Sequence, residues 1–183
     1  MIDPAPGILL IADPFLQDPN FLRTVVVLCE KNKEGAIGFV LNRLFDHTLD
    51  ELLPDLEGHD FPVYYGGPVQ PETIHMLHLY PEEIPGGQEI SPGVCWGGDF
   101  EAVISMLHKG ELKKDRIRFF IGYSGWSEGQ LEDEITEKSW LTVESDPALI
   151  FQTKTEEVWK GSLRKVGGDY EMMVNFPIDP QLN

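Results

Sequence analysis

The sequence predicts an α+β fold built around a curved, largely antiparallel β-sheet with several short helices. Strand-like apolar runs come in groups, and helix signals fall irregularly between them rather than in a βαβα alternation. A polar link of hairpin length, residues 31–35, joins two of these runs, which predicts an antiparallel pair. With 183 residues, of which 42% are hydrophobic, the chain is large enough for one domain with a real core, and two small lobes are the alternative.

The predicted strands are β-branched or continuously apolar stretches flanked by turn-forming residues. Gly38 lies inside the third of them, which indicates a bulge or a close backbone approach. Residues 80–93 are rich in Pro, Gly and Glu and are predicted to form a long loop. The expected strands are residues 7–12, 24–30, 36–42, 61–65, 73–79, 94–96, 117–121 and 140–143, and residues 170–174 are expected to be extended.

Helix starts are indicated by capping residues. A Ser or Thr followed three residues later by Glu or Gln has the form of a capping box, which satisfies N–H groups of the first turn. Asp99 is a cap of another kind, because an i, i+3, i+4, i+7 apolar stripe follows it. Pro147 suits the first turn of a short helix. Helices are therefore expected to begin at Thr48, Asp99, Ser127, Ser145 and Thr153.

The chain is strongly acidic, since 31 Asp and Glu residues against 14 Lys and Arg residues give a formal net charge of −17. Such a field repels nucleic-acid phosphates and anionic membrane surfaces over about 8–10 Å at physiological salt. The densest basic segment, residues 109–118, also contains acidic residues and is expected to be a solvated surface. Neither a nucleic-acid partner nor membrane association is therefore predicted.

Three features bear on the cellular compartment. The first apolar run, residues 8–12, is too short for a signal peptide, and no basic segment precedes it. No stretch of the sequence approaches the roughly 20 apolar residues of a membrane span. Cys29 and Cys95 are expected to be reduced thiols rather than a disulfide. Together these features predict a cytoplasmic location.

No motif in the sequence defines a catalytic group. Ser124 follows a predicted strand, but the nucleophile elbow Gly-x-Ser-x-Gly requires glycine where this chain has Trp126. His75 and His78 are spaced i, i+3 rather than at the i, i+4 spacing of a zinc-protease helix. The acidic residues within 128–134 lack the spacing of a calcium loop and suit a helix N-terminus. No catalytic residue, metal or cofactor is therefore predicted.

The candidate binding surface is centred on the segment that follows the predicted strand 117–121. A turn over residues 122–129 is expected to present aromatic side chains beside a helix N-terminus, whose free N–H groups favour anions. A cleft would lie between this turn, the strand end at residues 42–43 and the turn at residues 66–67, and a purely structural corner is the alternative. The candidate ligand- or partner-binding residues are Asn42, Arg43, Gly66, Gly67, His78, Tyr123, Trp126, Gln130 and Glu132.

Six blocks of sequence, taken in order, show a resemblance to a known family. They are residues 7–26 with Pro14 and Arg23, residues 35–43, residues 66–69, residues 77–78, residues 122–134, and residues 176–183 with Pro177, Asp179, Pro180 and Asn183. This set is similar to the YqgE/AlgH family of bacterial cytoplasmic proteins over essentially the whole chain, residues 1–183. The resemblance implies a single compact domain with a bifurcated, barrel-like sheet and no established enzymatic activity. Some members of the family are labelled regulators of transcription.

Three functions follow as hypotheses. The first is a non-enzymatic cytoplasmic regulator that acts by binding a protein or a small ligand rather than DNA. The second is a small-molecule-binding protein or enzyme with its cleft at residues 122–129. The third is a regulator that contacts DNA directly, which depends on the family label alone because the chain has no basic recognition helix. The sequence does not address the oligomeric state.

Overall fold

A ten-stranded sheet forms the centre of the molecule. The computed structural model describes residues 1–178, and its strand order is β10-β1-β2-β3-β9-β6-β8-β7, with β4 paired to β5 and β5 paired to β9. Among the described residues β5 and β9 run parallel, and the other strand pairs run antiparallel. The strands are β1 (Ile8–Ala12), β2 (Val25–Asn32), β3 (Gly35–Val40), β4 (Leu44–Thr48), β5 (Pro62–Tyr65), β6 (Val69–His78), β7 (Gln88–Ser91), β8 (Val94–Trp96), β9 (Ile117–Ser127) and β10 (Trp140–Glu144).

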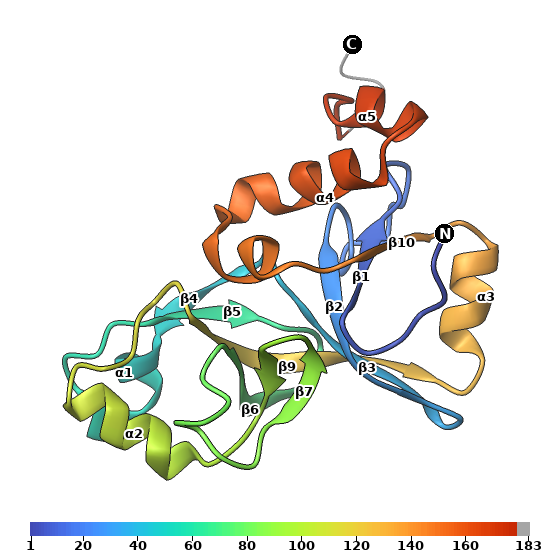
Figure 1. The fold of residues 1–183 in the computed structure, drawn as a ribbon. Helices are drawn as coiled ribbons and strands as arrows, with labels where there is room; N and C mark the ends of the chain where they lie inside the picture. The colour runs from blue at the N-terminus through green and yellow to red at the C-terminus, as the bar shows by residue number, and fades with distance from the viewer. Residues whose placement is uncertain (179–183) are drawn as a thin grey trace.

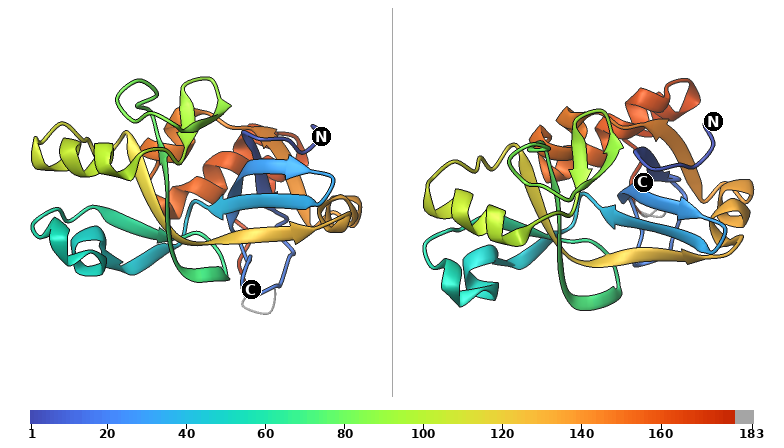
Figure 2. Two further views of the ribbon diagram at one scale, coloured as in Figure 1. Left: turned by 90° about the horizontal axis from the view of Figure 1, so that it is seen from below. Right: turned by 60° about the horizontal axis from the view of Figure 1, so that its bottom comes forward.

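Short helices cover the ends and one side of this sheet. In Figures 1 and 2, α1 and α2 lie together at one end of the molecule and α3 lies at the other. α4 packs on β1, β2 and β10, and α5 packs on α4. Within residues 1–178, no helix is both long and apolar enough to cross a membrane. The helices are α1 (Leu49–Leu52), α2 (Phe100–His108), α3 (Gln130–Thr136), α4 (Val158–Val166) and α5 (Asp169–Met173), with 3₁₀ turns at Pro54–Leu56 and Thr155–Glu157 and a π-helical turn at Ala148–Gln152.

β9 joins the two halves of the sheet. Its N-terminal half lies between β5 and β6, where Phe119 pairs with Val63 on one side and Met76 on the other. Its C-terminal half lies beside β3 and pairs Ser127 with Gly35, and Figure 1 shows the strand running from one half of the sheet into the other. The sheet therefore divides along β9 and curls into a half-barrel. The predicted α+β class, a single compact domain with a curved and bifurcated sheet, is confirmed.

Three groups of buried side chains form the core, and β9 contributes to each. Phe120 packs in the group beneath α4, and Phe119 packs in the group beneath α1 and α2. Successive residues of a strand point to opposite faces, which explains why these neighbours enter different groups. Trp126 belongs to the third group, which lies between β1–β3 and α3 together with Trp140 and Leu131.

The bend of β9 is made at Gly122, which packs against the backbone of Gly66 and Gly67. Gly122 has a φ of +67°, and the Gly66 N–H donates to the Ile121 carbonyl at 2.9 Å. A Cβ atom at Gly67 would lie 2.2 Å from the carbonyl carbon of Tyr123. Real Cβ atoms do not approach a backbone that closely, so glycine at this position is required for the two segments to meet.

Gly67→Ala is therefore expected to be strongly destabilising. The added methyl group meets backbone atoms that cannot rotate away, so the free energy of unfolding should fall by about 3 kcal/mol or more. Gly58→Ala is the control, because Gly58 has a φ of +87° but nothing lies within 4 Å of the place that its Cβ atom would take. That variant should lose only about 1 kcal/mol. Urea unfolding measures the free energy of unfolding of both variants. An equal decrease in Gly67→Ala and Gly58→Ala would contradict the packing role of Gly67.

The turn predicted at residues 122–129 is wrong, because residues 122–127 belong to strand β9. β9 continues to Ser127 through its pairing with β3, and α3 begins at Gln130 rather than near Ser127. The Gln130 side chain does reach back, since its Oε1 accepts the Ser127 N–H at 3.1 Å. The bond from the Gln130 side chain to the Ser127 backbone therefore forms at the strand end, and Ser127 lies two residues before the N-cap residue of α3, Gly129.

Two further segments differ from the prediction. Residues 80–93 contain β7, which pairs with β8, and bury Ile84 and Ile90. Residues 170–174 are mainly helical rather than extended, because Tyr170, Met173 and Val174 place an i, i+3, i+4 apolar face on the core beneath α4. β4 was not predicted because its side chains are mostly exposed and polar.

The remaining caps divide into confirmed and wrong predictions. The capping box of Thr48 and Glu51 forms, and the Asp99 carboxylate accepts the Glu101 N–H at 3.0 Å. A π-helical turn begins just after Pro147. The box predicted at Thr153 is wrong, because that hydroxyl donates to the Ala148 carbonyl at 2.8 Å and closes the preceding turn. Gly38 packs closely on β2 beside a register shift after Leu28, as expected.

Candidate functional site

The segment from β9 into α3 is packed as a corner. Trp126 is 6% exposed and Trp140 is 1% exposed. The Oε2 atom of Glu134 accepts both indole N–H groups, at 2.8 Å from Trp126 and 2.7 Å from Trp140. Gln130 donates to the other carboxylate oxygen at 2.9 Å. One carboxylate therefore satisfies two buried indoles and closes the corner.

Glu134→Ala is expected to lower the free energy of unfolding by about 2–4 kcal/mol, because it leaves two buried indole N–H groups unpaired. Glu132→Ala is the matched control on the same helix. Its carboxylate is exposed and pairs with Lys31 at the surface, and such pairs contribute less than about 1 kcal/mol. Urea unfolding followed by tryptophan fluorescence compares them, and a small loss in Glu134→Ala would refute the corner role.

Asn42 and Arg43, at the end of β3, hold the loop between β1 and β2. The Asn42 side chain accepts the Val25 N–H at 2.9 Å and donates to the Arg23 carbonyl at 2.8 Å. Arg43 donates to the Leu22 carbonyl at 3.1 Å. Both predicted residues therefore position a loop through its backbone rather than face an open cleft.

Arg23 extends from this loop to the C-terminal part of the chain. It adopts a φ of +52°, which costs a residue with a side chain about 1–2 kcal/mol. Its guanidinium lies 4.6 Å from the centre of the Trp159 ring and donates to the Phe176 carbonyl. Trp159 is itself anchored, because its indole N–H donates to the Ala12 carbonyl at 2.9 Å. Arg23 thus ties the first loop to the residues after α5.

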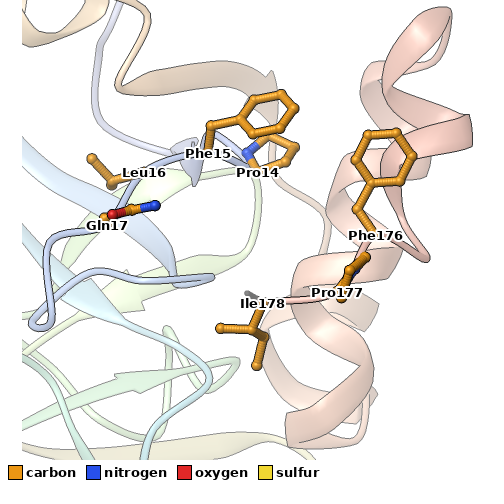
Figure 3. Close-up of a pocket in the computed structure, with 7 residues that line it drawn as sticks. All are labelled: Pro14, Phe15, Leu16, Gln17, Phe176, Pro177 and Ile178. Atoms are coloured by element: carbon orange, nitrogen blue, oxygen red, sulfur yellow. The ribbon is translucent and has the colours of Figure 1, made fainter. Parts of the chain in front are cut away.

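An apolar groove lies between these two tied segments. Figure 3 shows residues 14–17 on one side and residues 176–178 on the other. The groove encloses about 230 Å³, and the Phe15 and Phe176 ring centres are 6.2 Å apart. Phe15 is 60% exposed and Ile178 is 63% exposed. This grouping of exposed apolar side chains makes the groove a candidate interaction site.

A hollow with charged residues of both signs adjoins the groove. It shares Phe15, Leu16 and Gln17 with the groove and is bordered by Asp13, Glu137 and Lys138. We define the apolar groove together with this hollow as the Phe15 surface. Among the described residues no three His, Cys, Asp or Glu side chains group as a metal site, here or elsewhere.

The nine candidate residues do not share one surface. Gly66 and Gly67 meet the Tyr123 segment by backbone packing, and the Tyr65 N–H donates to the Arg43 carbonyl at 2.7 Å, so these segments converge. Tyr123 is half-buried, Trp126 points into the corner, and Gln130 and Glu132 are exposed on α3. The three segments that were expected to enclose a cleft therefore meet through closely packed backbone.

His78 lies in the interior, fully buried. Its Nδ1 accepts the Tyr80 N–H at 3.2 Å, so its other nitrogen, Nε2, carries the proton that is donated to the Gly97 carbonyl at 2.8 Å. Burial lowers the pKa of His78, and the Gly97 bond and Glu83 oppose this only in part. The imidazole is therefore a neutral bridge between β6 and the end of β8.

The stability of the protein should fall as the pH drops below about 6.5, the pKa of an unperturbed histidine. Below that pH the unfolded chain binds a proton at His78 that the folded chain excludes, which favours unfolding. His78→Gln retains a donor for the Gly97 carbonyl but does not titrate. The free energy of unfolding of this variant should therefore fall less between pH 7.5 and 5 than that of the unchanged protein. His75, whose pKa is also lowered by burial, accounts for part of the loss that remains. Urea unfolding at each pH measures this free energy. An equal fall in the unchanged protein and in His78→Gln would contradict the assignment to His78.

Both cysteines are free and buried, in agreement with the expected reduced thiols. Burial raises the pKa of Cys29 well above its usual value, and burial together with Glu89 raises that of Cys95. A raised pKa keeps each thiol protonated at neutral pH. Neither side chain therefore has the character of an activated nucleophile.

Sequence reasoning did not identify Phe15, Phe176 or Ile178 as a surface, because they lie in turn-rich segments far apart in the chain. A usable signal was present, namely large apolar residues beside Pro14 and Pro177, outside any predicted strand or helix. The other end of the family block that contains Phe176, including Asp179, Pro180 and Asn183, lies outside the described residues.

Fold and surface together define a single-domain α+β half-barrel protein with an apolar surface groove. The family described as AlgH-like matches residues 9–171, and the chain belongs to this family.

Relatives and solved structures agree with this assignment. A UPF0301 protein from Chlorobium luteolum is 44% identical over 179 residues, which cover 98% of this chain and 95% of the relative. The solution structure of the AlgH protein from Pseudomonas aeruginosa matches with a TM-score of 0.75 and 28% identity, over 97% of this chain and 98% of that one. A crystal structure of a Corynebacterium diphtheriae protein has a TM-score of 0.81 at 19% identity, over 96% and 94% of the two chains, and supports the fold alone.

Proposed function

We propose that this protein is a non-enzymatic regulator that binds another protein through the Phe15 surface. The supporting observation is the grouping of Phe15, Phe176 and Ile178, all more than 40% exposed, around a groove. Regulation of transcription would then be indirect, by way of the bound protein. The two free thiols suit the reducing cytoplasm as the place of action.

The partner's chemistry follows from charge. The chain has a net charge of −17, and the carboxylates of Asp13 and Glu137 outnumber the one cation, Lys138, at the border of the hollow. A basic segment with one apolar face would place its apolar side chains between Phe15 and Phe176 and its cations near the carboxylates. Electrostatic attraction of this kind speeds association and selects the partner.

The other two hypotheses have less support. The cleft proposed at residues 122–129 would need Trp126 and Tyr123 to face a ligand, whereas Trp126 packs on Trp140 and Glu134. Direct DNA contact would need a basic surface, and acidic residues outnumber basic ones by 31 to 14. A sequence-specific gel shift by the purified protein at physiological salt would overturn our preference for a protein partner.

A photo-crosslinking amino acid at position 15 tests the proposal in living cells. The matched control is position 44, since Leu44 is 61% exposed on β4 and Phe15 is 60% exposed. We expect a discrete protein adduct at position 15 that is missing at position 44. The adduct is identified by mass spectrometry, and the captured protein should contain a basic, amphipathic segment.

Binding is then measured with the purified partner. Phe15→Ser should weaken the affinity tenfold or more, since truncating a central aromatic contact costs at least about 1.4 kcal/mol. Leu44→Ser should change it less than twofold. Raising the salt concentration should slow association if the carboxylates attract the partner. Equal effects of the two substitutions would refute the Phe15 surface as the binding site.

A further inference from the structure

A buried arginine without a counter-ion lies beneath the segment that joins the π-helical turn to α4. Arg118, near the start of β9, is 6% exposed. Among the residues that the structure describes, no carboxylate forms an ion pair with it, although the chain has 31 acidic residues. Buried charges in proteins are normally paired, so this unpaired one calls for an explanation beyond packing.

The hydrogen-bond donors of Arg118 are poorly used. Its Nη1 atom is buried and has no partner within residues 1–178. Its Nη2 atom donates to the Thr153 carbonyl over 3.5 Å, which is long for a hydrogen bond. The guanidinium carbon lies 4.2 Å from the centre of the Tyr64 ring. The end of the guanidinium that carries both Nη atoms is therefore directed toward Thr153 but lacks a strong acceptor there.

Arg118 keeps its charge in this environment. Burial lowers its pKa from the ordinary value, and Tyr64 opposes this only in part. The ordinary pKa of an arginine is about 12.5 or higher, so the side chain remains protonated at neutral pH. The positive charge is therefore desolvated and unbalanced. An anion that pairs with it would compensate for the lost hydration.

Thr153 belongs to a short covering segment, residues 152–157, which we call the lid. Phe151, which is 3% exposed, and Val158, which is fully buried, anchor its two ends, but none of its own side chains is buried. Over the described part of the chain, no backbone hydrogen bond joins the lid to the sheet. A segment with few buried contacts opens at low cost in free energy. The lid can therefore move away from Arg118 while its anchors stay in place.

We propose that Arg118 is the binding group of a site for a small carboxylate, which enters when the lid opens. A carboxylate accepts two parallel hydrogen bonds from a guanidinium and balances its charge, whereas the Thr153 carbonyl accepts one long bond. The lid admits a free small molecule rather than a protein segment, since only residues 152–157 move. The site shares no residue with the Phe15 surface, so this proposal and the protein partner can fail independently.

The test is a titration of the full-length protein with sodium acetate, followed by ¹H–¹⁵N NMR. We expect shifts of the Thr153 and Lys154 amides and of the Arg118 side-chain signal, with a dissociation constant of about 1–10 mM for so small a ligand. Acetamide has the shape of acetate without its charge and should cause none of these shifts. Sodium chloride at the same concentration should not reproduce them, and equal shifts with chloride would overturn the assignment to a carboxylate.

Two substitutions at position 118 separate charge from geometry. Arg118→Met removes the charge, so acetate should cause no shift at Thr153. The urea midpoint of this variant should stay the same or rise, because an unpaired charge is no longer buried. Arg118→Lys keeps the charge but not the fork of donors, so acetate should bind about tenfold more weakly. Phe15→Ser alters the other surface and should leave the acetate shifts unchanged.

Arg116→Met is the matched control. Arg116 also lies over a tyrosine ring, 4.9 Å from the centre of Tyr80, and donates to the Leu79 carbonyl at 2.8 Å, but it is exposed to solvent. Its substitution should leave the acetate shifts unchanged. The proposal is overturned if Arg118→Met still responds to acetate. It is also overturned if Arg118→Met unfolds at a clearly lower urea concentration, which would make the arginine a structural residue.

Hydrogen exchange tests the opening of the lid. The Thr153 N–H donates to the Ala148 carbonyl at 2.9 Å, and the Ile150 N–H donates to the Asp146 carbonyl at 3.3 Å. Acetate binds the open form, in which Thr153 has left its place, so it should speed exchange at Thr153 and leave exchange at Ile150 unchanged. Unchanged exchange at Thr153 in saturating acetate would show that the lid stays closed and would overturn the proposal.

Discussion

The close passage of β9 over the Gly66–Gly67 backbone is the contact on which the rest of the structure depends. Gly122 bends the strand at this point, so its first half serves β5 and β6 and its second half serves β3. Because β9 supplies side chains to all three core groups, a shift of its path would disturb each of them. Gly66 and Gly67, which the sequence marks as candidate binding residues, are therefore explained by backbone packing.

The same junction connects the fold to the Phe15 surface. The Arg43 carbonyl accepts a hydrogen bond from the N–H of Tyr65, the residue before Gly66. The Arg43 side chain donates a hydrogen bond to the Leu22 carbonyl in the loop between β1 and β2. Asn42 fixes the backbone of Arg23, and Arg23 reaches Trp159 and the Phe176 carbonyl. A chain of polar contacts thus runs from the centre of the sheet through the loop at Leu22 and Arg23 to the Phe176 wall of the groove. Residues that the sequence marks as candidates act here by positioning others.

The fold could be predicted to a large extent from the sequence. Strongly β-branched runs such as residues 24–30 and a clear apolar stripe after Asp99 depend on local pattern, and both predictions held. The turn assigned to residues 122–129 failed, because glycine and serine there are compatible with either a turn or a bent strand. Pairing with β3, a contact between residues about 90 positions apart, decides between them. Local signals contain no information on such a pairing.

The candidate site was harder to predict for a related reason. Phe15 and Phe176 become neighbours only when Arg23 joins their segments, and His78 is enclosed only once β8 has paired with β6. Exposure and burial are properties of the assembled sheet rather than of a residue type. The cap at Thr153 shows the same limit, since the hydroxyl was already used by the turn before it.

Hydrogen exchange of the protein, alone and bound to the partner captured at position 15, tests the central claim most directly. If the Phe15 surface is the binding site, residues 13–17 and 174–178 gain protection on binding and residues 122–134 exchange as before. Protection confined to residues 122–134, with residues 13–17 unchanged, would contradict the account. It would indicate that the partner binds at the corner formed by β9 and α3.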